Sequence, residues 1–177
     1  MRLIRIRAAW LAAAVVAAVT LGGATASVAE TPTESGKRGT TLYVDGAVVQ
    51  RLRLTAGALT TLPRQTVTVT FRGSAGLQTH TYTGPLLRDV FALAGPAFDP
   101  AVRGDRVRHT VTATGGDGYR AVLAWAEVDP DFEGKDVLVA VTEDGRATAD
   151  GRPRLVVPGD VEGSRHVAGL VHLRLSR

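Results

Sequence analysis

Alternating polar and apolar residues dominate the chain after residue 40, and this period of two is typical of half-buried β-strands. The clearest case is 66–71, where threonines alternate with Val67, Val69 and Phe71; the stretches 41–44, 47–54 and 78–82 are expected as strands as well. Asp45-Gly46 lies between 41–44 and 47–54 and predicts a two-residue hairpin turn there. Further strands are expected over 107–114, 119–124, 136–142 and 166–175.

Three segments carry helical signals instead. The strongest runs from Pro85, which fits a first helical position, to Ala94; its apolar stripe comprises Leu86, Leu87, Val90, Phe91 and Ala94. Gly95-Pro96 is expected to end it. Thr55 predicts the cap of a short helix through Leu62, and 126–129 predicts one further turn. The elements together predict a single α+β domain, mostly β with short helices.

The first 29 residues have the pattern of an export signal. Three arginines precede an apolar run of 14 residues from Ala8 to Leu21, followed by the small-x-small patterns 24–26 and 27–29. Because a bilayer span needs roughly 20 apolar residues, we expect a cleaved signal peptide over 1–29 and no stable membrane insertion afterwards. An uncleaved anchor is the alternative. The polar segment 30–40 predicts a flexible leader, 41–177 the domain, and the location is expected to be periplasmic or extracellular.

The charge of the chain and its lack of cysteine limit which partners it can bind and which reactions its side chains can carry out. Without Arg2, Arg5 and Arg7, the 21 basic residues of the chain fall to 18, against 17 acidic ones. No basic stripe with interleaved aromatic residues is present, so no nucleic-acid partner is expected. The chain has no cysteine. This excludes thiol nucleophiles, thiolate metal ligands and disulfides.

Several patterns that mimic known sites are better explained by turns and strands. Gly116-x-Gly118-x-x-Ala121 precedes a strand-like segment, whereas a dinucleotide site needs a helix there. Asp129–Gly134 resembles the start of a calcium loop, but its twelfth position is Ala140, so a solvated acidic turn is expected. The histidines lack zinc-motif spacing; His166 and His172 would share one face of the last expected strand. We expect no metal site.

Three blocks, taken together, resemble a known family. Thr83-Gly84-Pro85-Leu86-Leu87 leads into a helix, Asp117-Gly118-Tyr119 forms a turn before a strand, and Arg152–Pro158 contains a Leu-Val-Val-Pro strand. In their order and spacing they resemble the molybdopterin-binding domain of sulfite-oxidase-type oxidoreductases, and in particular its short, exported, single-domain members. The resemblance implies a sulfite-oxidase-type molybdopterin-binding fold for residues 41–177.

The catalytic members of that family bind molybdenum through one cysteine thiolate, at or after the strand that precedes the Thr-Gly element. The corresponding stretch here, Thr70–Gly76, has serine but no cysteine, and a serine hydroxyl stays protonated near neutral pH. Arg5-Ile6-Arg7 is also not the twin arginine of proteins exported with their cofactor inside. We therefore assign no catalytic residue and expect no cofactor; molybdopterin is implied only if the family activity is retained.

The resemblance also implies ligand contacts. Basic side chains hold the pterin and its phosphate in the family, and the matching positions here are Arg154, Arg165 and His166, with Tyr119 and Arg120 near the same pocket. The alternative is that Tyr119 is a core aromatic residue and the arginines are solvated. The first hypothesis for function is a non-catalytic accessory module that binds a small anionic ligand or an envelope protein partner. A molybdopterin-dependent oxidoreductase with unusual metal ligation and a structural envelope protein are the alternatives.

Overall fold

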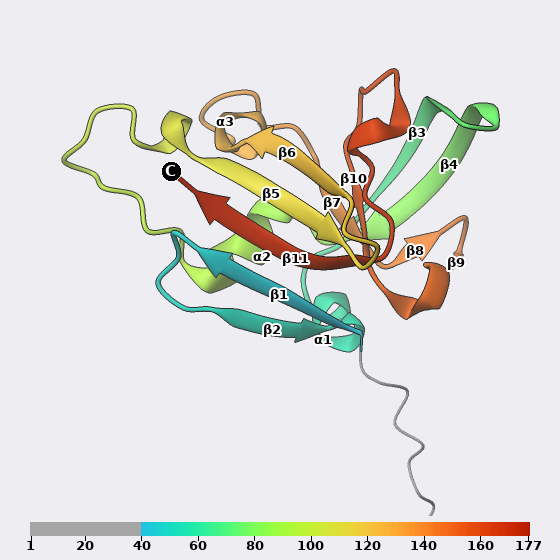
Figure 1. Ribbon diagram of the computed structural model, residues 1–177, viewed down its shortest axis with the longest axis horizontal. Helices are drawn as coiled ribbons and strands as arrows, with labels where there is room; N and C mark the ends of the chain where they lie inside the picture. Colours follow the sequence, from blue (N-terminus) through green and yellow to red (C-terminus); the bar gives the residue numbers. More distant parts are fainter. Residues whose placement is uncertain (1–39) are drawn as a thin grey trace, which may run out of the picture. The chain divides into compact units, whose positions relative to one another are not determined.

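The computed structural model describes residues 40–177 (Figure 1). The expected signal peptide over 1–29 and all of the expected leader except Thr40 lie outside the described residues. In chain order the elements, with η marking 3-10 helices, are β1 (Thr41–Gly46), β2 (Leu52–Thr55), α1 (Ala56–Thr60), β3 (Gln65–Gly73), β4 (Gly76–Gly84), α2 (Leu87–Ala94), η1 (Arg106–Arg108), β5 (Thr110–Gly115), β6 (Arg120–Ala124), α3 (Trp125–Val128), β7 (Leu138–Ala140), β8 (Thr142–Glu143), β9 (Arg146–Ala147), η2 (Ala149–Gly151), β10 (Arg154–Val156), η3 (Gly163–Arg165) and β11 (Leu170–Ser176).

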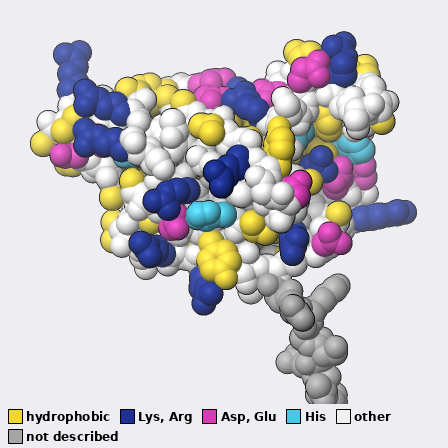
Figure 2. Space-filling model, viewed as in Figure 1, with side chains coloured by type: hydrophobic (Ala, Val, Ile, Leu, Met, Phe, Trp, Pro, Cys, Tyr) yellow, Lys and Arg dark blue, Asp and Glu magenta, His cyan; other side chains and the backbone are white. Residues whose placement is uncertain are grey.

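The larger sheet has five strands in the order β2-β1-β11-β5-β6. Its central strand, β11, runs parallel to β1 and antiparallel to β5. Alternate residues of these strands, among them Leu42, Val44, Leu173 and Leu175, are buried in the main core together with the apolar stripe of α2. The helix lies behind the sheet in Figure 1. The opposite face of the sheet is open, and Figure 2 shows basic side chains, in dark blue, around a histidine on it.

A smaller core lies beneath the β3–β4 hairpin. The hairpin belongs to a sheet of order β3-β4-β8-β9, and β10 pairs with β7 in a separate two-stranded ladder. Val69, Phe71 and Tyr82 of the hairpin are buried with Leu138 and Val156 of that ladder. The Thr-apolar alternation that predicted these strands therefore places the apolar residues inside and the threonines outside.

The helices are short and mostly begin where their caps predict. Thr55 caps α1, and its Oγ1 accepts a hydrogen bond from Ala58 N at 3.2 Å. The expectation that Pro85 begins α2 is wrong, because the Pro85 carbonyl accepts from Val139 N at 2.9 Å and the helix starts after Leu86. Gly95, in the left-handed region, ends it as expected. Among residues 40–177 no helix has the length and hydropathy to cross a membrane.

The first hairpin turns later than its sequence predicts. β1 continues through Asp45 and Gly46, which pair with Arg174 and Leu175 of β11, and the return to β2 runs through residues 47–51. The Asp45 carboxylate lies 3.1 Å from His172 Nε2 and 3.3 Å from Arg174 Nη1. The two-residue turn is therefore wrong, because pairing with a distant strand outweighs the local turn preference.

Two later strands also differ from expectation. β11 begins only at Leu170, and His166 lies in the loop after η3, so His166 and His172 do not share a strand face. The stretch expected as one strand over 136–142 is divided at Val141 into β7 and β8, which belong to different sheets. Val141 N instead donates to Thr83 O of β4 at 2.9 Å, which moves the chain from one sheet to the other.

The turn over 129–134 is solvated at Asp131 and Glu133, as expected, but its first residue, Asp129, is buried. Asp129 is 2% exposed, and its carboxylate accepts from Arg106 Nη1 at 2.9 and 3.1 Å and from Trp125 Nε1 at 3.0 Å. A buried carboxylate is tolerated only when it is paired and hydrogen-bonded. The sequence pattern missed this environment because its main partner is 23 residues away along the chain.

The Thr-Gly element crosses β7 at close range, and this contact accounts for its glycine. A Cβ atom at Gly84 would overlap the Val139 carbonyl oxygen and lie 2.6 Å from Ala140 Cα. Both neighbours are backbone atoms, so no side-chain rotation can relieve the overlap. The glycine of the Thr83–Leu87 block is therefore required by packing.

Replacing Gly84 by alanine should lower the free energy of unfolding by about 1–3 kcal/mol or more, because β4 and β7 must move apart. Gly57→Ala is the matched control: it lies in α1 with its nearest neighbour at 3.7 Å, so it should be neutral or stabilising by up to about 1 kcal/mol. Urea unfolding of both variants measures the difference. Equal effects of the two substitutions would contradict the packing argument.

Candidate functional site

A polar cleft lies between the tip of the β3–β4 hairpin, the start of β10 and the loop that contains η3. Its volume is about 390 Å³, and it is lined by Phe71, Arg72, Gly73, Ser74, Gln78, Arg154, Glu162, Gly163 and Ser164. The first four belong to the stretch Thr70–Gly76, which the family resemblance assigns to the molybdenum-binding thiolate. Of the five site residues expected from the sequence, Arg154 alone lines this cavity.

Phe71 closes the inner end of the cleft. Its side chain is 4% exposed, and its ring centroid lies 4.4 Å from that of His166 in an edge-to-face arrangement. A Cβ atom at Gly163 would lie 2.5 Å from Phe71 Cδ2, so η3 approaches this ring as closely as a glycine permits. The Phe71 ring therefore fills the space between the hairpin and the η3 loop.

His166 is buried beneath this ring. Its Nε2 lies 3.1 Å from the Val157 carbonyl, which can only accept, so Nε2 carries the proton. Its Nδ1 has no hydrogen-bond partner among the described residues. Burial lowers the pKa of His166 below its ordinary value, and the nearby positive charges of Arg154 and Arg165 act in the same direction.

Arg154 lies over the ring of Tyr82, with its Cζ 5.7 Å from the ring centroid. Its Nη1 contacts Glu143 Oε2 at 3.2 Å, and the Tyr82 hydroxyl donates to the other oxygen of Glu143 at 2.8 Å. Burial, followed by this hydrogen bond, raises the pKa of Tyr82. The Nε of Arg154 is buried without a partner within the described residues. This guanidinium therefore retains a donor that Glu143 does not use.

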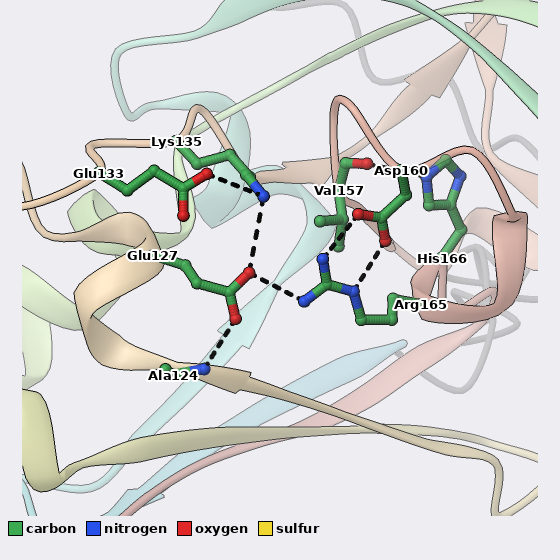
Figure 3. Close-up of polar contacts among 8 residues, drawn as sticks. All are labelled: Ala124, Glu127, Glu133, Lys135, Val157, Asp160, Arg165 and His166. Atoms are coloured by element: carbon green, nitrogen blue, oxygen red, sulfur yellow. Dashed lines mark hydrogen bonds and ion pairs between the residues drawn. The ribbon is translucent and has the colours of Figure 1, made fainter.

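Arg165 is held between two carboxylates (Figure 3). Its Nε and Nη2 donate to Asp160 at 2.8 and 2.6 Å, and its Nη1 donates to Glu127 at 2.8 Å. The Asp160 contact, followed by the Glu127 contact, raises the pKa of Arg165. Burial alone would raise the pKa of Glu127, but donors from Arg165 and Ala124 N bring it below its ordinary value. Arg165 thus joins the η3 loop to α3.

Tyr119 and Arg120 lie outside the cavity. The Tyr119 hydroxyl donates to Ser164 O at 2.5 Å, and its backbone N donates to Asp117 Oδ1 at 2.9 Å, which is the expected Asp-Gly turn. Its ring is 46% exposed, so it is not a core aromatic residue. Arg120 is exposed at the start of β6, opposite Thr114. Tyr119 therefore supports the η3 loop from outside, and Arg120 is not brought to the cleft.

A model of the family described as "Oxidoreductase molybdopterin binding domain" matches residues 29–177. The chain belongs to this family. The structure is similar to the sulfane dehydrogenase SoxCD from Paracoccus pantotrophus, with a TM-score of 0.62 and 23% identity over 77% of this chain. The chain spans 38% of the length of that SoxCD chain. No curated protein matches.

These comparisons confirm two expectations from the sequence: the molybdopterin-binding family, and a mostly β, α+β domain of the sulfite-oxidase type. In the structure β6, and not a helix, follows the turn at residues 116–118, as expected from the sequence, so the arrangement that a dinucleotide site needs is absent there. At 23% identity the likeness to SoxCD concerns the fold alone.

The residues of the cleft do not fit a molybdenum ion of the family type. The chain contains no cysteine, and the inward side chain of the stretch in question is Phe71. Among the described residues, no three or more His, Asp or Glu side chains are grouped so as to hold a metal ion. Ser74, the hydroxyl in this stretch, lines the cleft without supplying the soft thiolate ligand.

Some residues of the site were not singled out from the sequence. Glu143 and Glu162 each form one ion pair, with Arg154 and Arg72, at 3.2 and 3.0 Å. Asp144 accepts from Thr81 N at 2.9 Å and contacts His80 Nδ1 at 2.7 Å, and these two donors lower its pKa. Asp144-Gly145 has the sequence of a turn, and it is one; nothing local indicates that its side chain also binds the β3–β4 hairpin.

The buried His166 should make the protein less stable as the pH falls from about 7 to about 5.5. An unfolded chain protonates this histidine near its ordinary pKa of 6.5, whereas the folded chain does so only at lower pH, so protons favour unfolding in this window. The lowered pKa values of Glu127 and Asp144 act only below about pH 4.5. His166→Gln keeps a donor for Val157 O but does not titrate.

Urea unfolding at several pH values should therefore show a shallower slope of stability against pH for His166→Gln than for the parent protein. Parallel slopes between about pH 7 and pH 5.5 would show that His166 is protonated equally in both states, contrary to its environment.

Proposed function

We propose that this member of the family is a non-catalytic module that binds a small anionic ligand in the cleft. The observation that carries the proposal is Phe71. An aromatic ring cannot ligate molybdenum, and this ring is packed between His166 and Gly163 in the stretch where the catalytic members place their thiolate. Displacing it to admit a metal would open the smaller core.

The remaining lining of the cleft favours an anion. Arg72 and Arg154 both line it, together with Ser74, Ser164 and the Gln78 amide. Each arginine contacts one carboxylate, but a guanidinium has five N–H donors and can hold a second anion at the same time. A volume of about 390 Å³ lies at the small end of ligand pockets, which range from about 300 to 1,000 Å³.

The proposal includes an exported location, periplasmic or extracellular. Its support is the N-terminal pattern of three arginines, a 14-residue apolar run and small-x-small sites. The simplest route for such a chain is secretion before folding, which gives a cytoplasmic cofactor no opportunity to be inserted. This is consistent with a cleft whose inner end is closed by protein.

Protein purified from its native cells, without added cofactor, should contain molybdenum and pterin at far below one equivalent per chain. Metal analysis by mass spectrometry and fluorescence of the oxidised pterin measure both. Stoichiometric molybdenum and pterin would overturn the proposal and favour the oxidoreductase with unusual metal ligation.

Arg154→Ala should weaken the binding of inorganic phosphate or sulfate by about tenfold or more, because hydrogen bonds to charged groups contribute about 1.5–3 kcal/mol. Arg120→Ala is the matched control, since Arg120 is exposed and lies outside the cleft. Isothermal titration of the three proteins, each first checked for folding by circular dichroism, makes the comparison. If the parent protein binds neither anion, or both variants lose affinity equally, the cleft is not an anion site.

A further inference from the structure

β3 is an edge strand with an open hydrogen-bonding side. It pairs with β4 alone in the sheet order β3-β4-β8-β9. Arg72 N turns outward and donates to Val161 O at 2.8 Å. Because backbone groups alternate along a strand, the N–H and C=O groups of Thr66, Thr68 and Thr70 point to the same side as those of Arg72. No described residue bonds to these outward groups of the three threonines.

The open stretch has defined ends. Val161 and Glu162 occupy the place beside Arg72, and Pro63 precedes the strand at its other end. Pro63 is followed by Arg64, and β3 begins at Gln65. The seven residues of β3 that precede Arg72, Gln65 to Phe71, have the sequence Gln-Thr-Val-Thr-Val-Thr-Phe. The midpoint of this stretch is Thr68.

This stretch lacks the features that usually protect an edge strand. It contains no charged residue, no proline and no glycine, and six of its seven residues are threonine, valine or phenylalanine, which favour strands. Its length and uncharged character match those of segments that pair with other chains. The hairpin extends away from the five-stranded sheet in Figure 1.

The same stretch is complementary to itself. If a second copy lies antiparallel to it about a two-fold axis at Thr68, then Thr68 faces its own counterpart, Thr66 faces Thr70, and Val67 faces Val69. All three threonines stand on the outer face, where they already pair with Thr83, Thr81 and Thr79 of β4 at 2.8–2.9 Å. A two-fold axis perpendicular to the sheet keeps the threonines of both copies on one face and the valines on the other.

We propose that β3 is a homodimerisation edge, at which two copies of this chain pair antiparallel about Thr68 to join their four-stranded sheets. The three threonine pairings supply about six backbone hydrogen bonds, two for each pair. A strand edge of seven residues buries less surface than the roughly 1,200–2,000 Å² of a stable interface. The dimer is therefore weak and reversible, and it forms as the concentration rises.

In the proposed dimer Thr68 of one copy lies opposite Thr68 of the other, and the test makes use of this pairing. Thr68→Lys and Thr68→Glu each place two like charges directly opposite one another, which is destabilising in a sheet, and each should weaken the dimer by about tenfold or more. Their equimolar mixture places lysine opposite glutamate and should restore the dimer. Sedimentation velocity over a concentration series, at low salt, measures the association of the parent protein, the two variants and the mixture.

Thr81→Lys is the matched control. It removes the same hydroxyl contact between Thr68 and Thr81 and adds the same charge to the same face, but one strand inward from the edge. It should dimerise like the parent protein. Thr68 is exposed and Thr81 is half-buried. Neither side chain lies in a core, so the variants should fold, and thermal melts check that they do.

A parent protein that stays monomeric at every concentration overturns the proposal, as does a Thr81→Lys variant as impaired as Thr68→Lys. A mixture of the two Thr68 variants that fails to associate likewise overturns the two-fold pairing at Thr68. If the parent protein is monomeric but β3 is protected from hydrogen exchange by another envelope protein, the edge serves a different partner and self-pairing is wrong.

Discussion

The position of β11 between β1 and β5 is the constraint on which the rest of the domain depends. β11, the last strand, pairs in parallel with β1, the first described strand, and antiparallel with β5, and so closes the larger sheet across its centre. It also fixes one end of the η3 loop, while β10 fixes the other: Leu155 and Val167 exchange backbone hydrogen bonds at 2.9 and 3.1 Å, and Leu170 N donates to Pro153 O at 2.8 Å. One wall of the cleft is therefore held by strands on both sides, although the wall itself has little regular structure.

Local chemistry made part of the fold predictable. The cap at Thr55, the Thr-Val alternation of β3 and the Asp117 turn depend on residues within a few positions of each other, and each is found as expected. The Asp45-Gly46 turn failed because β1 must remain extended beside β11, and no local pattern indicates a parallel partner more than a hundred residues away. The family motifs supplied what periodicity could not, namely the fold to which these strands belong.

For the charged groups of the site as well, the sequence did not predict the contacts with residues that are distant along the chain. Arginine at three positions suggested a basic pocket, yet the three side chains have different environments. Arg165 is neutralised by Asp160 and Glu127, Arg154 is partly neutralised by Glu143, and Arg120 lies on an open surface. The sequence identifies which residues can bind an anion, but the carboxylates that compete for them come from other elements. Phe71 was within reach of sequence analysis, since it lies in the stretch where a cysteine would be expected.

The place of β11 in the chain also sets an order of events during biosynthesis. β1 and β5 are its two neighbours, and both are made long before Leu170–Ser176. Until those last residues leave the ribosome, the larger sheet consists of two separate hairpins, β1–β2 and β5–β6, that have nothing between them. Two isolated hairpins are marginal in water. The larger sheet can therefore become stable only once Leu170–Ser176 has been made and has inserted between the two hairpins.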